Sequence, residues 1–136
     1  MKPEDIPNKI AYAVFGLEAL YLKADERGEL AQRLAQRVAK VMSKLGKGDS
    51  KEIFNAIKRA YRIRSAFVHG EPLRNGKYRD RSLLDKLAEY LRTSILIFMQ
   101  VSMEKDELVN LIDDALIDES SNKKLEYVIK EIQYLK

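Results

Sequence analysis

Hydrophobic residues recur every three or four positions through most of the chain, a spacing that places them on one face of an α-helix. No stretch shows the sustained alternation that is typical of a β-strand. Helical spacing covers six segments, which run from about Pro7 to Lys23, Glu26 to Leu45, Asp49 or Ser50 to Gly70, Ser82 to Met103, Asp106 to Ile117 and Ser121 to Leu135. The pattern predicts an all-α fold, a helical bundle of about five or six helices with an up-and-down core.

Residues that end helices or cap them mark several of these boundaries. The turn Gly46-Lys47-Gly48 follows the second segment, and Asp49 with Glu52 has the spacing of a capping box at the start of the third. Gly70-Glu71-Pro72 closes the third segment, because proline cannot continue a helix and glycine favours its end. We therefore expect the third helix to stop close to His69.

The first predicted helix is apolar on nearly all sides, and Glu18 is the only charge between Ile10 and Leu22. Such a helix lies at the centre of a core or in a subunit interface. A carboxylate on it is costly to bury without a partner. We expect Glu18 to form a structural ion pair with Arg37, with Arg64 as the other candidate.

Length and composition narrow the class of protein. A chain of 136 residues can bury a sizeable core without covalent links, so residues 1–136 are predicted to be one domain. With no cysteine and one histidine, one chain cannot build a zinc–thiolate site or a multi-histidine cluster, and we expect neither a metal nor a cofactor. No secretion signal or apolar run near the roughly 20 residues of a membrane span is present, which predicts a cytoplasmic protein without a membrane partner.

Charge is concentrated along the chain. Residues 58–81 hold eight basic residues against the two acids Glu71 and Asp80, and residues 104–119 hold seven acids and one lysine. A concentrated basic stretch is the electrostatic footprint of a nucleic-acid or nucleotide binder. The candidates for phosphate or RNA contacts are Arg59, Arg62, Arg74, Lys77, Arg79 and Arg81. The alternative is a solvated helix face that keeps the protein soluble.

The only histidine, His69, lies inside this basic stretch, five residues after Arg64. Histidine takes and gives protons near neutral pH, and arginine is a permanently charged fork suited to phosphate. On an ideal helix the two would lie about 140° apart, so they can meet only if the helix ends near His69. One imidazole cannot be base and acid at once, which favours two histidines from a symmetric dimer. Attack of an RNA 2′-hydroxyl on its neighbouring phosphate fits these groups.

The segment Tyr61-x-x-Arg64-Ser65-x-x-x-His69-Gly70 resembles the motif of the HEPN domain superfamily, especially its Apea-like branch. The similarity extends upstream through Leu17-Glu18-Ala19-Leu20 and through residues 34–39, and it covers roughly residues 10–100. The resemblance implies a helical bundle that dimerises through the helices carrying the motif and, in active members, cleaves RNA without a metal. It makes Arg64 and His69 catalytic and Ser65 the polar residue that helps to orient them.

Partners follow from the same resemblance. RNA and a second copy of the chain are expected, and an antitoxin or a nucleotidyltransferase is a further candidate. Some members place a tyrosine two residues after the histidine, where a partner nucleotidyltransferase modifies it. This chain has Glu71 at that position, with Tyr78 in the following loop, and so departs from that pattern.

Three interpretations remain open on the sequence. The leading one is a metal-independent endoribonuclease with a composite dimer site. The second is a non-catalytic HEPN-like module that binds RNA, nucleotide or a protein through the same surface. The third is a helical interaction domain that docks a partner on its first helix or on Ile95 to Val101. In the structural interpretation of the motif, His69 donates to a carbonyl at a helix end and Arg64 forms an ordinary ion pair.

Overall fold

The computed structural model describes residues 1–73 and 76–132, with only the backbone of Lys77. The described residues form helices and no strand, which confirms the all-α class. Six α-helices span α1 Ile6–Tyr21, α2 Leu30–Lys44, α3 Ser50–Val68, α4 Arg81–Gln100, α5 Lys105–Ala115 and α6 Glu119–Lys130, and two short 3₁₀ turns span η1 Pro3–Asp5 and η2 Gly76–Tyr78.

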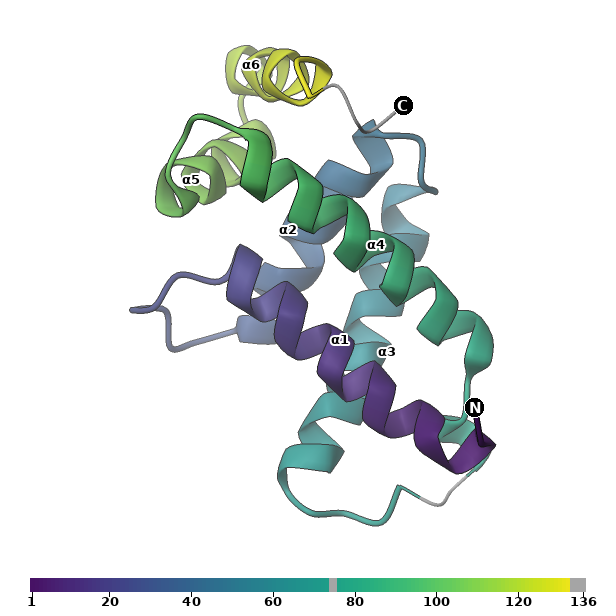
Figure 1. The fold of residues 1–136 in the computed structure, drawn as a ribbon. Helices are drawn as coiled ribbons and strands as arrows, with labels where there is room; N and C mark the ends of the chain where they lie inside the picture. The colour runs from purple at the N-terminus through teal and green to yellow at the C-terminus, as the bar shows by residue number, and fades with distance from the viewer. Residues whose placement is uncertain (74–75, 133–136) are drawn as a thin grey trace.

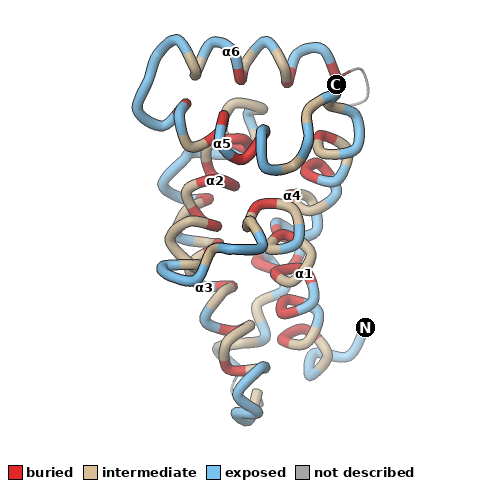
Figure 2. The backbone as a smooth tube through the Cα atoms, turned by 90° about the vertical axis from the view of Figure 1, so that its left-hand side faces the viewer, coloured by how far each residue is buried: buried red, intermediate tan, exposed pale blue. Residues whose placement is uncertain are grey.

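Four long helices build the body of the bundle, and α5 with α6 covers one end of it. In Figure 1, α1 and α4 cross the front and α2 and α3 lie behind them, an arrangement that Figure 2 shows from the side. The core runs through all of these layers and includes the fully buried Leu17, Leu34, Ile57, Leu87 and Ile112. α1 packs on both α3 and α4, so within one chain the nearly all-apolar first helix lies in the core, the first of the two predicted alternatives.

Two local features explain how the long helices meet and begin. At Gly16 a Cβ atom would lie 2.9 Å from Cδ1 of Leu91, so the glycine permits the close approach of α1 and α4. At the start of α3 the Asp49 carboxylate accepts from the backbone N–H groups of Lys51 and Glu52 at 3.1 and 3.2 Å. This confirms the predicted cap and satisfies two N–H groups that the helix itself leaves without partners.

The helix boundaries differ from the predicted ones in places that have physical reasons. α2 begins at Leu30 and not at Glu26, because Glu29 is in the left-handed conformation at φ 55° and the Glu26 side chain turns inward. α4 ends at Gln100, where Val101 is extended. α6 ends at Lys130; the predicted end at Leu135 falls outside the described residues.

A buried arginine fastens the loop between α1 and α2 to the rest of the bundle. Arg37 is 1% exposed and donates to Glu26 through Nη1 and Nη2 at 2.6 and 2.8 Å. It also donates to Asp113 on α5 at 2.8 and 2.9 Å and to the backbone oxygen of Tyr21 at 2.8 Å. The prediction that Arg37 pairs with Glu18 is therefore wrong. Carboxylates from the loop and from α5, together with the Tyr21 backbone oxygen, take up the N–H groups of Arg37, and none is left for the Glu18 carboxylate.

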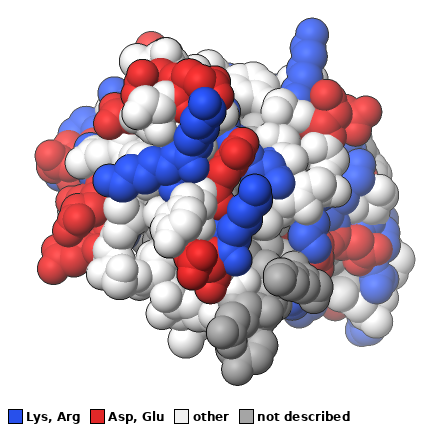
Figure 3. Space-filling model, turned by 90° about the horizontal axis from the view of Figure 1, so that it is seen from above, with Lys and Arg blue, Asp and Glu red and all other residues white. Residues whose placement is uncertain are grey.

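The acidic stretch of the chain and the C-terminus of α3 lie at opposite ends of the bundle. The acidic stretch of residues 104–119 belongs to α5 and the start of α6, at the top of Figure 1, whereas α3 ends at the bottom. Seen from above, that end displays acidic and basic side chains close together (Figure 3). No helix in the described part of the chain is long and apolar enough to cross a membrane.

Candidate functional site

The C-terminus of α3 places the only histidine at a sharply defined helix end. His69 is the C-cap residue, and Gly70 follows in the left-handed conformation at φ 71°. The N–H of Gly70 donates to the Phe67 oxygen at 3.2 Å and that of Glu71 to the Ala66 oxygen at 2.9 Å. These two bonds form a Schellman motif, which glycine accommodates without strain. The predicted stop at Gly70 is confirmed.

His69 is exposed, and its imidazole makes no hydrogen bond to another described residue. Only its backbone N–H is engaged, donating to the Ser65 oxygen at 3.0 Å. Ser65 precedes it by four residues, and residues at that spacing are neighbours on a helix surface. The imidazole is therefore open to a ligand, with the partly exposed Ser65 side chain beside it.

Arg64 faces α1 and is held on several sides. Its Nε lies 3.0 Å from Oε1 of Glu18, and the two side chains are 24% and 14% exposed. The guanidinium carbon lies 5.3 Å from the centre of the Phe15 ring and 5.1 Å from that of Tyr61. Of the two candidate partners for Glu18, the structure selects Arg64. The arginine is held in place from α1 and from its own helix.

The Glu18–Arg64 pair is close but poorly aligned. Among the described residues, neither Oε1 of Glu18 nor Nε of Arg64 has a hydrogen-bond partner, because the N–H is not aimed at the oxygen. Burial raises the pKa of the Glu18 carboxyl, and the Arg64 charge offsets this only in part. A buried donor without a well-made bond gains more from a new acceptor than a satisfied one does. A phosphate oxygen is an acceptor of that kind.

Arg64 and His69 are not joined within one chain. No hydrogen bond or ion pair links the guanidinium to the imidazole among the residues that the structure describes. The structural interpretation of the motif expects an ordinary ion pair at Arg64 and a hydrogen bond from His69 to a carbonyl. The ion pair of Arg64 is present. No hydrogen bond from the His69 ring to a carbonyl is found among the described residues. A guanidinium can stabilise an anion and an imidazole can transfer a proton, and the end of α3 carries one group of each kind.

The predicted phosphate-binding residues differ in their exposure and in whether an acidic side chain already pairs with them. Arg62 is exposed and forms no ion pair with a described residue, whereas Arg59 pairs with Asp80 and Arg81 pairs with Asp85 at 3.3 Å. Arg79 is exposed. Arg74 and the side chain of Lys77 lie outside the described residues. A depression of about 360 Å³ brings Arg59 and Arg62 together with Tyr78.

An apolar surface, which we call the α1–α3 patch, lies next to Arg64. It consists of Tyr12 and Phe15 from α1 and Phe67 and Val68 from α3. The Phe67 ring meets those of Tyr12 and Phe15 edge-on, with centres 5.6 and 6.0 Å apart. Tyr12 is 55% exposed and brings this aromatic cluster to the molecular surface, and Val68, which follows Phe67 in α3, is 52% exposed. Exposed apolar residues that are grouped mark an interaction site more often than isolated ones do.

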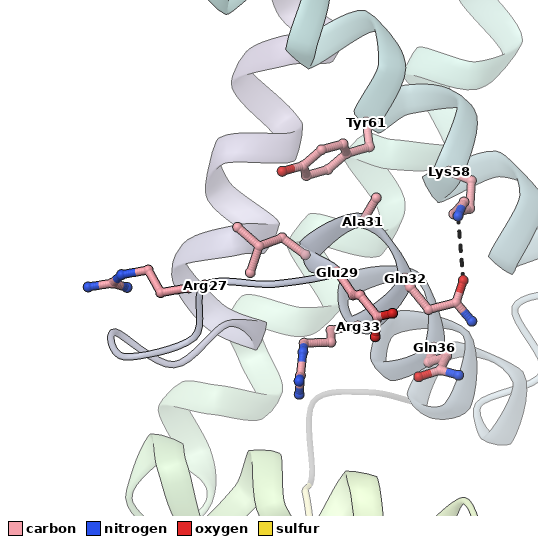
Figure 4. Close-up of a pocket in the computed structure, with 9 residues that line it drawn as sticks. Arg27, Glu29, Ala31, Gln32, Arg33, Gln36, Lys58 and Tyr61 are labelled. Carbon is pink, nitrogen blue, oxygen red and sulfur yellow. Dashed lines mark hydrogen bonds between the residues drawn. The ribbon is translucent and has the colours of Figure 1, made fainter.

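A second hollow was not foreseen from the sequence. An open depression of about 910 Å³ lies between the start of α2, the loop before it and the middle of α3 (Figure 4). Three cationic side chains line it, and these are Arg27, Arg33 and Lys58. The only sequence signal for it is Lys58, at the edge of the basic stretch, because Arg27 and Arg33 come from a segment with mixed charges.

The described residues contain no group of three or more metal-ligating side chains. In comparisons with known proteins, no family model matches the chain, and no curated protein or solved structure matches it either.

Proposed function

We propose that this protein is a metal-independent endoribonuclease of the HEPN type, which cleaves RNA at a composite site in a homodimer. The observation that carries the proposal is the end of α3, where an exposed His69 follows, five residues later on the same helix, an Arg64 that is held by α1. The motif resemblance supplies the reaction class. The same proposal includes a protein partner in addition to RNA, either an antitoxin or a nucleotidyltransferase.

In the proposed reaction the imidazole of one His69 accepts the proton of an RNA 2′-hydroxyl. The oxygen then attacks the adjacent phosphorus, and the 5′-oxygen of the next nucleotide leaves with a proton from the second imidazole. Arg64 stabilises the added negative charge on the phosphoryl oxygens. Ser65 lies beside His69 and positions the ring or the substrate. The products are a 2′,3′-cyclic phosphate and a free 5′-hydroxyl.

The dimer in this proposal forms through the α1–α3 patch. Pairing two such patches across a twofold axis would cover Tyr12 and Val68 and bring two α3 ends together. The isologous contact places both Arg64 side chains and both His69 side chains around one cleft. This arrangement supplies the second histidine that the chemistry needs.

Substitution of Val68 tests the interface. Val68→Glu introduces a charge into the apolar contact, and we expect the protein to elute as a monomer in size-exclusion chromatography with light scattering and to lose cleavage. Ile117→Glu is the matched control, because Ile117 is 89% exposed at the other end of the bundle. The control should remain dimeric and active. A dimeric Val68→Glu protein would contradict the proposed interface.

The reaction class is tested by the substrate. Wild-type protein in EDTA is expected to cleave single-stranded RNA, and to leave intact the same sequence made of 2′-O-methyl RNA or of DNA, because both lack the nucleophile. Cleavage of DNA, or loss of RNA cleavage in EDTA with recovery on adding Mg²⁺, would contradict the mechanism.

The Glu18–Arg64 pair specifically favours a second candidate, a non-catalytic HEPN-like module that binds RNA, nucleotide or protein. An arginine that already has a carboxylate partner has less charge to offer a transition state. RNA binding without turnover would favour this candidate over the nuclease.

A further inference from the structure

The depression between α2 and α3 has the make-up of a nucleotide-binding surface. Its lining includes the apolar residues Leu30 and Ala31 from the start of α2 and Tyr61 from α3, and the Tyr61 ring extends from α3 toward Ala31 in Figure 4. Arg27, Arg33 and Lys58 stand around it and outnumber the one acid, Glu29. Aromatic and apolar surface accepts a base, and a cationic rim accepts the phosphates beside it.

The cations of the rim differ in how far they are already engaged. Arg33 pairs with Glu26 at 3.0 Å and donates to the Gly28 oxygen at 3.0 Å. Within the described part of the chain, Arg27 donates only to backbone oxygens, those of Ala24 and Glu26, and Lys58 donates to the Gln32 amide oxygen at 3.4 Å. Neither Arg27 nor Lys58 forms an ion pair with a described carboxylate. These two side chains retain charge for a polyanion.

The depression is connected to the end of α3 in two ways. Tyr61 lines it and also stacks on the Arg64 guanidinium, 5.1 Å from the ring centre. Along α3, Lys58 is followed by Arg62, Ser65 and His69 at intervals of four, three and four, which places them on one face of the helix. Arg62 and His69 are exposed and the other two partly exposed. From Lys58 to His69 the helix rises about 16 Å.

We propose that this depression anchors a single-stranded segment of the RNA substrate a few nucleotides from the cleaved phosphate, and that the Lys58–His69 face of α3 leads the strand from it to the site. A base lies against Tyr61 and Leu30, and Arg27 and Lys58 contact the flanking phosphates. The inference rests on the proposed function for its substrate. To the proposed function it adds the path of the RNA strand over the protein surface, and it implies a minimum length of RNA that can reach both the depression and the site.

The test compares two double variants, each made with His69→Ala so that the probe stays intact. Arg27→Ala with Lys58→Ala removes the two cations of the depression. Lys123→Ala with Lys124→Ala removes the same charge from the exposed side of α6 and is the control. The probe is a short, fluorescently labelled single-stranded RNA, and anisotropy gives Kd over a series of salt concentrations. Thermal unfolding checks that both variants keep the fold.

We expect the depression variant to bind about tenfold more weakly at low salt than the His69→Ala parent. Its plot of log K against log salt should flatten by about 0.7 for each phosphate that the protein no longer neutralises. The α6 variant should match the parent. Equal affinities for the two double variants would overturn the proposal, whether both match the parent or both are weakened, because net charge alone would explain a shared weakening.

Wild-type cleavage separates this inference from the proposed function. If wild-type protein cleaves RNA but the depression variant binds normally, the nuclease stands and the anchoring surface falls. If wild-type protein binds RNA through Arg27 and Lys58 without cleaving it, the nuclease falls and the surface remains an RNA site. If wild-type protein cleaves no RNA and the parent binds none at low salt, both fall.

A kinetic comparison adds a readout that mere structural damage would not give. In the background with His69 intact, the depression variant should show a raised KM for long RNA and an unchanged kcat/KM for a dinucleotide, which is too short to reach the depression. An equal fall in kcat/KM on both substrates would contradict the anchoring role.

Discussion

His69→Ala is expected to lower the rate of RNA cleavage by about 10³-fold or more while leaving the fold and the dimer unchanged. General acid and base groups each contribute roughly 10² to 10⁴ to a rate, and the substitution removes both imidazoles from the composite site. The side chain is exposed and bonds no described residue, so its removal disturbs no packing. Single-turnover cleavage of labelled RNA measures the effect, with circular dichroism and light scattering as checks.

Glu71→Ala is the matched control for His69. Glu71 is exposed two residues further on, and its only bond in the helix end comes from the backbone, which the substitution keeps. We expect wild-type cleavage from this variant. If His69→Ala cleaves as fast as Glu71→Ala, the histidine has no part in the chemistry.

Arg37→Ala is expected to have the largest effect on stability, a decrease of about 3 to 5 kcal/mol in the free energy of unfolding. The substitution leaves Glu26, whose side chain is 8% exposed, without its main partner and removes a link between α2 and α5. Arg33→Ala is the control, since Arg33 pairs with the same carboxylate from a side chain that is 43% exposed. Its cost should stay within about 1 kcal/mol. Urea unfolding measures both, and similar decreases would contradict this account of Arg37.

The same network gives stability a dependence on pH. Hydrogen bonds from Arg37 lower the pKa of Glu26 to about 2, from 4.5. A lowered pKa means that the stabilisation is present above about pH 4.5 and disappears as the pH falls toward 2. Wild-type protein should exceed Glu26→Gln in stability by up to about 3 kcal/mol at pH 7. That difference should shrink steadily between pH 5 and pH 2, and a difference independent of pH would contradict the assignment.

The fold was accessible from the sequence wherever local chemistry decides it. Asp49 caps α3 and Gly70 ends it as predicted, because both positions depend on neighbouring residues alone. The start of α2 was missed because Glu26 is drawn inward by Arg37, eleven residues away along the chain. Nothing in the spacing of polar residues reports such a contact. An arginine on the apolar side of α2 signals that some carboxylate must meet it, without saying which.

The candidate site was accessible only in part for the same reason. The sequence marks Arg64 and His69 as a pair but does not show that Arg64 turns to Glu18 and to two aromatic rings on α1 and α3. The sequence offers Arg59 and Arg81 as candidates for phosphate contacts, and in the fold both pair with acids at the start of α4. The depression at Lys58 and Tyr61 depends on how α2 packs against α3. The spacing of residues along the sequence therefore does not predict this depression.

If a histidine pair promotes attack by the 2′-hydroxyl, the ends of the cleavage products reveal it. Wild-type and His69→Ala proteins, purified side by side, are incubated with RNA in EDTA and the fragments are analysed by mass spectrometry. We expect 2′,3′-cyclic phosphate and 5′-hydroxyl ends from the wild-type protein and intact RNA from the His69→Ala variant. Fragments with 5′-phosphate ends, or the same cyclic ends from both proteins, would contradict it.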